Sequence, residues 1–317
     1  MTSPTEPPQS RLARPRFATW LGIALLALGT SLGFALPPER PSAARHDAFL
    51  FEEESPAYGI YGATGGTWLT GSTWDVQTVE RVARHAEQTG RVPVLVMYAI
   101  PGRDLNGPSG GGARNAAEYR RIIERVARAM GKARAIVILE PDALPLGLSP
   151  ALLREAIALF RTHAPRAELY LDAGHSNWQK PEVMAKRLVE AGIQEAAGFS
   201  LNVSAFEWTQ NNLDWGERTR QALMALDPAL AGKRFVIDTS RNGNGPGVDE
   251  QSRPTWGDPV RARNGGPIMA GPRPTFDTGH PHCAAFLWVK TPGFGDNRTR
   301  NATTFGGEDW VKPQPSP

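Results

Sequence analysis

Short apolar runs and amphipathic stretches alternate along the chain from about residue 90 onward. Val92–Tyr98 and Ala135–Leu139 are almost continuously apolar, as expected for strands that are buried on both faces. Between the strands, apolar residues recur at helical spacing, and Ser149 followed by Pro150 is a typical helix start. The predicted strands are Val92–Tyr98, Ala135–Leu139, Glu168–Leu171, Gly198–Val203, Arg234–Ile237 and Ala284–Val289, and the predicted helices are Glu118–Met130, Ser149–His163, Pro181–Ala191 and Arg218–Leu230.

The repeated strand–helix unit predicts the fold class. Consecutive strands that are joined by helices form a parallel sheet. The chain after residue 44 has about 270 residues, which is enough to close such a sheet into a barrel. We therefore expect an α/β fold in the form of a (β/α) barrel, with a doubly wound open sheet as the structural alternative.

The first 44 residues differ from the rest of the chain. Three arginines precede an apolar run from Trp20 to Leu36, and a proline-rich stretch follows this run. A basic flank, a short apolar stretch and small residues after it are typical of a secretory leader. An uncleaved anchor is the alternative, although this run lies at the short limit for a membrane span. We expect residues 45–317 to form a single exported domain.

Charge and cysteine content exclude several classes of function. Lys and Arg number 35 against 32 for Asp and Glu, so bulk charge gives no footprint for nucleic acid. Cys283 is the single cysteine, which excludes an intrachain disulfide and a cysteine-rich metal site. Nine tryptophans, in contrast, are a high number and hint at the ligand class.

Aspartates follow the predicted strands at their C-terminal ends, where barrels place their chemistry. They are Asp104, Asp142, Asp172, Asp238 and Asp296, and Trp178, Trp256 and Trp288 lie near them in the sequence. One such aspartate alone is commonly a helix cap, whereas five together with tryptophans favour a carbohydrate site. Cleaving a glycosidic bond requires one carboxyl group that stays protonated and another group that activates water. Clustered carboxylates raise one another's pKa and so supply the protonated acid.

Six motifs occur in a fixed order along the chain. They are Tyr98–Asp104 (YAIPGRD), Ile138–Leu144 (ILEPDAL), Tyr170–His175 (YLDAGH), Asn202–Ser204 (NVS), Asp238–Gly245 (DTSRNGNG) and Leu287–Gly293 (LWVKTPG). Together they resemble glycoside hydrolase family 6 from about residue 55 to residue 312. The resemblance implies an inverting β-1,4-glucanase, either a cellobiohydrolase or an endoglucanase, that needs no cofactor. It also implies a distorted, partly open, TIM-like barrel with the active site at the C-terminal ends of its strands.

The resemblance assigns roles to acidic residues by position. Asp142 matches the general acid, and Asp104 matches the carboxylate that keeps this acid protonated and relays a proton from water. Ser109 matches a serine that orients the water chain, and Asp172 matches a supporting acidic residue. Asp296 matches the residue that is usually proposed as the base.

Substrate-binding positions follow from the same resemblance. Tyr98 matches the tyrosine that lies beneath the distorted sugar. The matching sugar-binding positions are His175, Trp178, Asn202, Trp256 and Lys290. Trp68 is a further candidate platform, with core packing as the alternative interpretation.

The sequence departs from the family pattern at three positions. Phe294 replaces a glutamate that would hydrogen-bond sugar hydroxyls. Leu105 and Gly257 stand where the family commonly has cysteines, so the resemblance implies that both family disulfides are missing. Because Asp296 is retained, we expect an active enzyme.

The remaining motifs favour ordinary structural roles. His280 and His282 resemble a metal-binding pair, but no carboxylate spacing or cysteine cluster supports one, so we expect no metal. The predicted function is that of a secreted, monomeric, endo-acting β-1,4-glucanase with a β-glucan substrate. Exo action and a non-catalytic β-glucan-binding protein on the same fold are the alternatives.

Overall fold

The computed structural model describes residues 49–50, 65–107, 109–249, 251–255, 261–263 and 267–293. All of these residues belong to one compact unit, which extends from Ser42 to Pro317. The predicted leader lies outside the described residues, and so do Trp256, Phe294 and Asp296. Within the described part, no helix is both long enough and apolar enough to cross a membrane.

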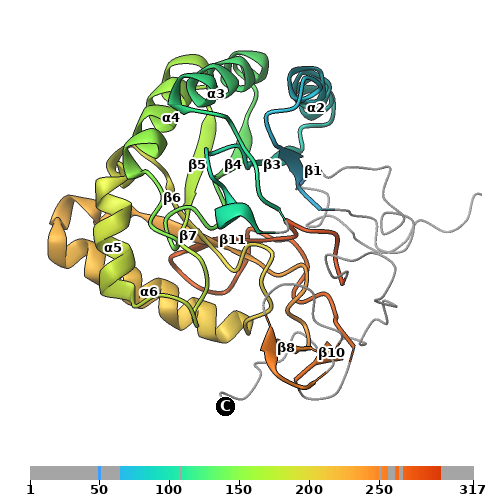
Figure 1. The fold of residues 1–317 in the computed structure, drawn as a ribbon, viewed down its shortest axis with the longest axis vertical. Helices are drawn as coiled ribbons and strands as arrows, with labels where there is room; N and C mark the ends of the chain where they lie inside the picture. Colours follow the sequence, from blue (N-terminus) through green and yellow to red (C-terminus); the bar gives the residue numbers. More distant parts are fainter. Residues whose placement is uncertain are drawn as a thin grey trace, which may run out of the picture. The chain divides into compact units, whose positions relative to one another are not determined.

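The central sheet is entirely parallel and has the strand order β1-β3-β4-β5-β6-β7-β11, with β2 also paired to β3 (Figure 1). Its strands are β1 (Phe49–Leu50), β2 (Thr67–Leu69), β3 (Val92–Met97), β4 (Ala135–Leu139), β5 (Ala167–Asp172), β6 (Gly198–Leu201), β7 (Arg234–Asp238) and β11 (Cys283–Leu287). A small antiparallel sheet contains β8 (Gly247–Val248), β9 (Pro254–Thr255) and β10 (Arg261–Ala262).

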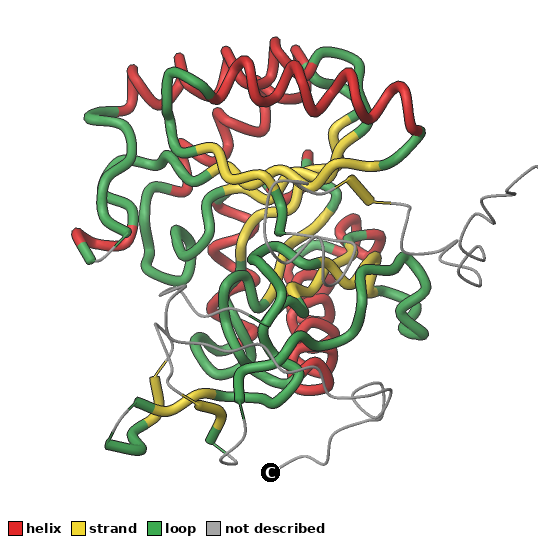
Figure 2. Tube along the Cα trace, turned by 90° about the vertical axis from the view of Figure 1, so that its right-hand side faces the viewer, coloured by secondary structure: helices red, strands yellow, loops and turns green. Residues whose placement is uncertain are grey.

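Helices connect successive strands and cover the outer face of the curved sheet (Figures 1 and 2). They are α2 (Asp75–Thr89), α3 (Ala116–Met130), α4 (Pro150–His163), α5 (Pro181–Glu190) and α6 (Thr209–Leu226), with single turns at η2 (Asp104–Asn106), η3 (Ile193–Glu195) and η4 (Pro228–Gly232). Each of α2 to α5 contacts the next helix in the row. This arrangement confirms the predicted repetition of strand and helix.

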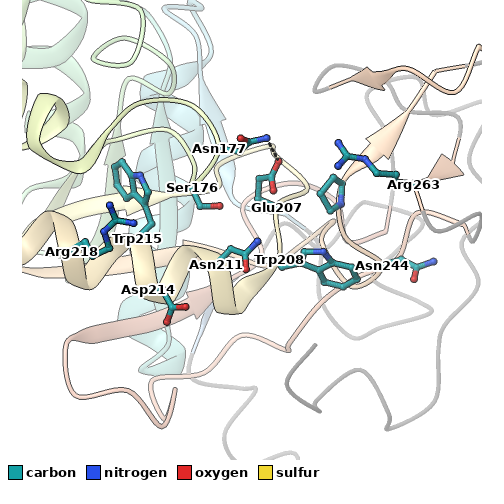
Figure 3. Close-up of a pocket in the computed structure, with 11 residues that line it drawn as sticks. Ser176, Asn177, Glu207, Trp208, Asn211, Asp214, Trp215, Arg218, Asn244 and Arg263 are labelled. Atoms are coloured by element: carbon teal, nitrogen blue, oxygen red, sulfur yellow. Dashed lines mark hydrogen bonds between the residues drawn. The ribbon is translucent and has the colours of Figure 1, made fainter. Parts of the chain in front are cut away.

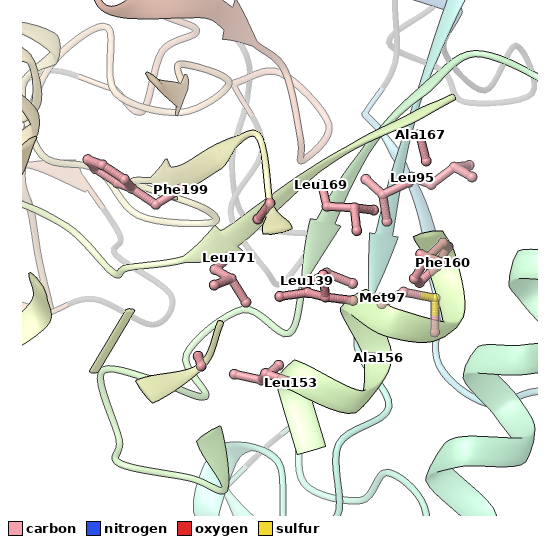
Figure 4. Close-up of a cluster of buried hydrophobic side chains, with 14 of the residues drawn as sticks. Leu95, Met97, Leu139, Leu153, Ala156, Phe160, Ala167, Leu169, Leu171 and Phe199 are labelled. Atoms are coloured by element: carbon pink, nitrogen blue, oxygen red, sulfur yellow. The ribbon is translucent and has the colours of Figure 1, made fainter. Parts of the chain in front are cut away.

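Strands β3, β4, β5, β7 and β11 each contribute to two separate cores, which explains why these strands are apolar at almost every position. In β3, Leu95 and Met97 point toward the helices, whereas Val94 and Val96 belong to the cluster inside the barrel. Figure 4 shows the outer cluster, in which Leu95 and other strand side chains pack against helix α4. Because successive side chains of a strand point to opposite faces, both faces must be apolar when both are buried.

The barrel is almost closed at the edge between β2 and β11. The Gly66 N–H donates to the carbonyl of Val289 at 3.1 Å, but no ladder joins the two strands in the described residues. Gly65 is required at this edge, since a Cβ atom there would lie 2.6 Å from the carbonyl carbon of Lys290. The predicted fold class is therefore confirmed: the structure is a distorted, partly open (β/α) barrel.

Two helix predictions need correction. Helix α6 begins at Thr209 rather than Arg218, and the polar residues of its first turns conceal this start in the sequence. It ends at Leu226, before Pro228, rather than at Leu230. Helix α4 begins at Pro150 as predicted, but the Ser149 side chain makes no capping hydrogen bond.

Candidate functional site

The predicted carboxylates gather at the C-terminal edge of the parallel sheet. Asp172 and Asp238 are the last residues of β5 and β7, and Asp142 follows β4 by three residues. Asp104 begins the turn η2 that follows β3. Parallel strands end at the same edge of a barrel, so four of the five aspartates identified in the sequence share one edge.

Tyr98 and Asp142 form the contact at the centre of this edge. The Tyr98 hydroxyl donates to Oδ2 of Asp142 at 3.3 Å. Burial raises the pKa of Tyr98 well above its usual value, and the negative charges of Asp142 and Asp104 raise it further. The phenol therefore stays protonated and acts as a hydrogen-bond donor. Trp68 packs edge-on against the Tyr98 ring with 5.4 Å between the ring centroids, so it lies beside the site and against the inner core.

Asp172 holds the backbone of Asp142. Its buried Oδ2 accepts the N–H groups of Asp142 at 2.9 Å and Gly174 at 3.1 Å, and the Ser200 hydroxyl donates to Oδ1 at 3.3 Å. Burial raises the pKa of Asp172 well above its usual value, and the charge of Asp142 adds to the effect. Asp142 has a φ of 71°, an unfavourable conformation for a residue other than glycine. Asp172 thus fixes the candidate acid in a strained position.

Hydrogen bonds between side chains and backbone groups hold the loop that carries Asp104. Oδ2 of Asp104 accepts the N–H of Ser109 at 2.7 Å, while Nε of Arg103 donates to the carbonyl of Ser109 at 2.8 Å. The Arg103 guanidinium also donates to the carbonyl of Tyr98 and lies 4.8 Å from the centroid of the Tyr98 ring. Ser109 itself is exposed, so its side chain is accessible to water.

His175 and Trp178 form a polar and aromatic pair after β5. Their ring centroids are 5.4 Å apart, and Trp178 is 37% exposed. Burial lowers the pKa of His175 to about 4, so the imidazole is neutral at ordinary pH. An exposed indole beside a neutral imidazole suits an uncharged, polyhydroxylated ligand.

Asn202 lies beneath the surface rather than in a position to touch a ligand. It is fully buried, its Nδ2 donates to the carbonyl of Asp238 at 2.9 Å, and its Oδ1 accepts the N–H of Glu207 at 3.1 Å. A sugar has no access to this side chain in the described conformation. The structure therefore gives Asn202 a supporting position, in contrast to the sugar-binding position expected from the sequence.

Lys290 follows β11 and reaches toward the opposite edge of the barrel. Its Nζ lies 4.5 Å from the centroid of the Trp68 ring. Asp238 supports this region, because its carboxylate accepts the N–H groups of Val289 at 3.1 Å, Ser240 at 2.9 Å and Ser204 at 2.9 Å. Trp256 and Asp296 lie outside the described residues, so their predicted roles remain predictions.

A hollow of about 670 Å³ adjoins the loop that follows His175 (Figure 3). Ser176 and Asn177 form one side of it, and Nδ2 of Asn177 donates to Oε1 of Glu207 at 3.4 Å. Its other lining residues are Trp208, Asn211, Asp214, Trp215, Arg218, Asn244, Pro246 and Arg263. This hollow was not predictable from the sequence, because most of its wall comes from helix α6 and from loop residues outside the six motifs, with Asn244 as an exception.

The two histidines before β11 belong to a hydrogen-bonded network. Nδ1 of His282 lies 2.8 Å from Oε2 of Glu217, and its Nε2 lies 3.2 Å from Nη2 of Arg220. Nδ1 of His280 accepts the N–H groups of His282 and Cys283 at 3.3 and 3.2 Å. Glu217, His280 and His282 lie close enough to hold a metal ion, but three of the four ring nitrogens already have protein partners. These contacts, with a guanidinium at the centre, favour a structural role.

Two residues that the sequence analysis did not single out also serve the site. Arg103 holds the Tyr98 and Ser109 carbonyls, and Glu140 accepts two backbone N–H groups from the loop after β3. Arg103 adjoins Asp104, and Glu140 lies two residues before Asp142 in the same motif. A charged residue within two positions of a candidate catalytic aspartate was therefore the available signal.

The geometry places carboxylates, a tyrosine and an exposed tryptophan at the end of a parallel barrel, and comparison with known families decides which barrel this is. The family model of glycosyl hydrolases family 6 matches residues 52–317. The chain belongs to glycosyl hydrolase family 6. The resemblance seen in the ordered motifs is thus confirmed over nearly all of the chain that follows the predicted leader.

Similar proteins include endoglucanases and, at lower identity, cellobiohydrolases. The chain is 39% identical to endoglucanase A of Thermobispora bispora over 67% of this chain and 45% of that protein. It is 35% identical to endoglucanase A of Cellulomonas fimi over 77% of this chain and 51% of that protein. This family-6 chain therefore spans about half the length of these curated relatives. An endoglucanase of Mycobacterium tuberculosis, solved in complex with methyl-cellobiosyl-4-deoxy-4-thio-β-D-cellobioside, matches with a TM-score of 0.66 and 34% identity over 80% of this chain and 89% of that chain.

Proposed function

We propose that this protein is a glycoside hydrolase that cleaves β-1,4-glucosidic bonds of cellulose or a related β-glucan with inversion. The proposal rests chiefly on the placement of Asp142, which is fixed from behind by Asp172 and faces the Tyr98 hydroxyl. The chain's membership of family 6 and the cello-oligosaccharide analogue bound by its structural relative support the same substrate class.

In the proposed reaction Asp142 acts as the general acid. Its carboxyl proton passes to the glycosidic oxygen as the bond between that oxygen and the anomeric carbon breaks. A water molecule attacks the anomeric carbon from the opposite face, which inverts the configuration. Asp296, as the proposed base, takes the proton of this water, and a water chain beside Ser109 with Asp104 helps to relay it. Tyr98 lies beneath the sugar at the reacting position and keeps its own proton.

Endo action is the proposed mode of attack. Two relatives at 35–39% identity are named endoglucanases, which supports this mode. On carboxymethyl-cellulose, viscosity is expected to fall far faster than reducing ends appear. Cellobiose as nearly the sole early product would instead establish exo action.

Hydrolysis and inversion are tested together by NMR of products from a soluble cello-oligosaccharide. The α-anomer is expected first, and its appearance is expected to stop in Asp142→Asn, while Asp227→Asn in the turn before η4 serves as a matched control with normal activity. Initial release of the β-anomer would contradict inversion. Binding without any turnover in the wild type would instead support the non-catalytic alternative, which is motivated by Phe294 in place of the family's glutamate.

We further propose that the protein is secreted as a monomer through the leader in residues 1–44. The basic flank and the short apolar run support cleavage rather than anchoring. N-terminal sequencing of the exported protein is expected to begin just after Ala35 or just after Ala44. A mature protein that retains residues 20–36 and stays with the membrane would establish the anchor instead.

A further inference from the structure

Glu140 is a buried carboxyl group at the foot of the candidate site. It follows directly after β4, and its Oε2 accepts the N–H groups of Ala99 at 2.8 Å and Ile100 at 2.9 Å. These two amides come directly after Tyr98 in the neighbouring loop. Glu140 therefore connects the loop that carries Asp142 with the loop that carries Tyr98.

The connection extends to the glycine-rich segment beyond Asp104. The carbonyl of Ala99 accepts the N–H of Ala113 at 2.8 Å, so the peptide held by Glu140 also holds the end of this segment. Gly112 packs directly on Ile100, where a Cβ atom would lie 2.0 Å from the Ile100 carbonyl oxygen. Any shift of Ala99 and Ile100 is therefore transmitted to both ends of the loop that positions Asp104.

This placement is energetically costly for the fold alone. Glu140 has a φ of 52°, and burial raises its pKa to about 7 despite the N–H donors of Ile100 and Ala99. The Glu140 carboxyl group and the buried Tyr119 hydroxyl interact with each other, and this interaction offsets part of the rise in the pKa of Glu140. Among the described residues, however, neither Oε1 of Glu140 nor that hydroxyl has a hydrogen-bond partner of good geometry. Strain and buried polar groups that occur together beside a site are typical of residues retained for function.

We propose that Glu140 is a positioning residue for the hydrolytic reaction: its carboxyl group holds Tyr98 and the Asp104 loop in register with Asp142. The proposal rests on the proposed function. What matters is the acceptor oxygen rather than the charge, since one oxygen accepts both backbone N–H groups. Glutamine offers the same acceptor and a donor that faces the Tyr119 hydroxyl, whereas alanine offers neither.

Three variants of the full chain separate positioning from stability. Glu140→Ala removes the acceptor, Glu140→Gln keeps it, and Leu188→Ala creates a cavity in helix α5 without touching these loops. On a soluble cello-oligosaccharide, Glu140→Ala is expected to lower kcat by about 10- to 100-fold with KM changed by less than about threefold, because misplaced catalytic groups slow the chemical step. Glu140→Gln and Leu188→Ala are expected to keep kcat within about threefold of the wild type.

Amide hydrogen exchange of residues 98–101 provides a readout that does not depend on activity. Glu140→Ala is expected to speed exchange of the Ala99 and Ile100 amides by at least about tenfold, while Glu140→Gln leaves it near the wild-type rate. If Glu140→Ala does not fold, Glu140→Asp replaces it, since the shorter side chain withdraws the acceptor and is expected to lower kcat in the same direction.

Several results would overturn the proposal. One is an unchanged kcat in folded Glu140→Ala, and another is a loss in Glu140→Gln as large as that in Glu140→Ala. An equal loss of kcat in Leu188→Ala would show that lowered stability, rather than loss of the Glu140 acceptor, slows the reaction. Failure of this proposal can be distinguished from failure of the proposed function. A wild type without hydrolytic activity would refute the proposed function, whereas the exchange rates of the Ala99 and Ile100 amides would still show whether Glu140 holds the loop.

Discussion

Replacing Glu140 with glutamine is expected to change how the stability of the fold depends on pH. Burial raises the pKa of Glu140 from 4.5 to about 7, so the folded chain binds this proton more tightly than the unfolded chain. The contribution of Glu140 to stability is therefore fully present below pH 4.5 and is lost as the pH rises to about 7. Above that pH Glu140 is ionised in both the folded and the unfolded chain, so it no longer makes the unfolding free energy depend on pH.

The size of the effect follows from that interval. From 4.5 to about 7, at about 1.4 kcal/mol per pH unit, the wild type loses about 3 kcal/mol of unfolding free energy through this group. Glutamine has no proton to release, so the variant escapes this loss. The unfolding free energy of Glu140→Gln minus that of the wild type is thus expected to grow by about 3 kcal/mol between pH 4.5 and pH 7.5.

Urea unfolding at a series of pH values measures this difference. The difference between the two proteins is the relevant quantity, because burial also raises the pKa of Asp172 and Asp238 and gives the wild-type curve other sources of slope. Glu155→Gln is the matched control, since Glu155 is exposed, is paired with Arg120 and has a lowered pKa. A difference that stays constant with pH, or that favours the wild type at high pH, would refute the reasoning.

Three further predictions concern other buried groups. Asp172→Ala is expected to lower the unfolding free energy by about 2–6 kcal/mol in urea titrations, because it leaves the N–H groups of Asp142 and Gly174 without an acceptor. Asp172→Asn keeps an acceptor oxygen and is expected to lose less, so equal losses in the two variants would contradict this prediction. Burial lowers the pKa of His175 to about 4, so the affinity for cello-oligosaccharides, measured by tryptophan fluorescence, is expected to stay constant from about pH 8 to about pH 5. A decline in affinity centred near pH 6.5 would refute this prediction. Burial raises the pKa of the Cys283 thiol to about 12, so thiol reagents are expected to label it at pH 8 only after unfolding, and rapid labelling of the native chain would contradict its buried position.

The regular part of the fold was predictable because its strands are buried on both faces. Ala135–Leu139 was located with its exact bounds, since five consecutive apolar residues have no other good explanation in a βα repeat. Helix α6 was placed nine residues too late, because its N-terminal turns contain Asn211, Asn212 and Asp214. The two-residue strands β8, β9 and β10 were not predicted, since such short pairings leave no periodic pattern.

The candidate site was predictable to the extent that strand ends determine it. Asp104, Asp142 and Asp172 were identified because each follows an apolar run, and the structure places them at one edge. Contacts made over long sequence separations were not predictable. The Glu140 carboxyl group accepts the Ala99 amide from 41 residues away, and the burial of Asn202 depends on Asp238, 36 residues further on.

Buried carboxyl groups hold the loops of this barrel together just beyond the ends of its paired strands. Glu140 after β4 binds amides of the loop after β3, and Asp172 at the end of β5 binds the amide of Asp142 after β4. Asp238 at the end of β7 binds Ser204 after β6 and Val289 after β11. One carboxyl oxygen accepts two N–H groups at once in both Glu140 and Asp172, so a single side chain fixes two backbone amides. The same burial raises the pKa of all three groups, so the contribution of these three groups to stability is largest at acidic pH and is lost as the pH rises.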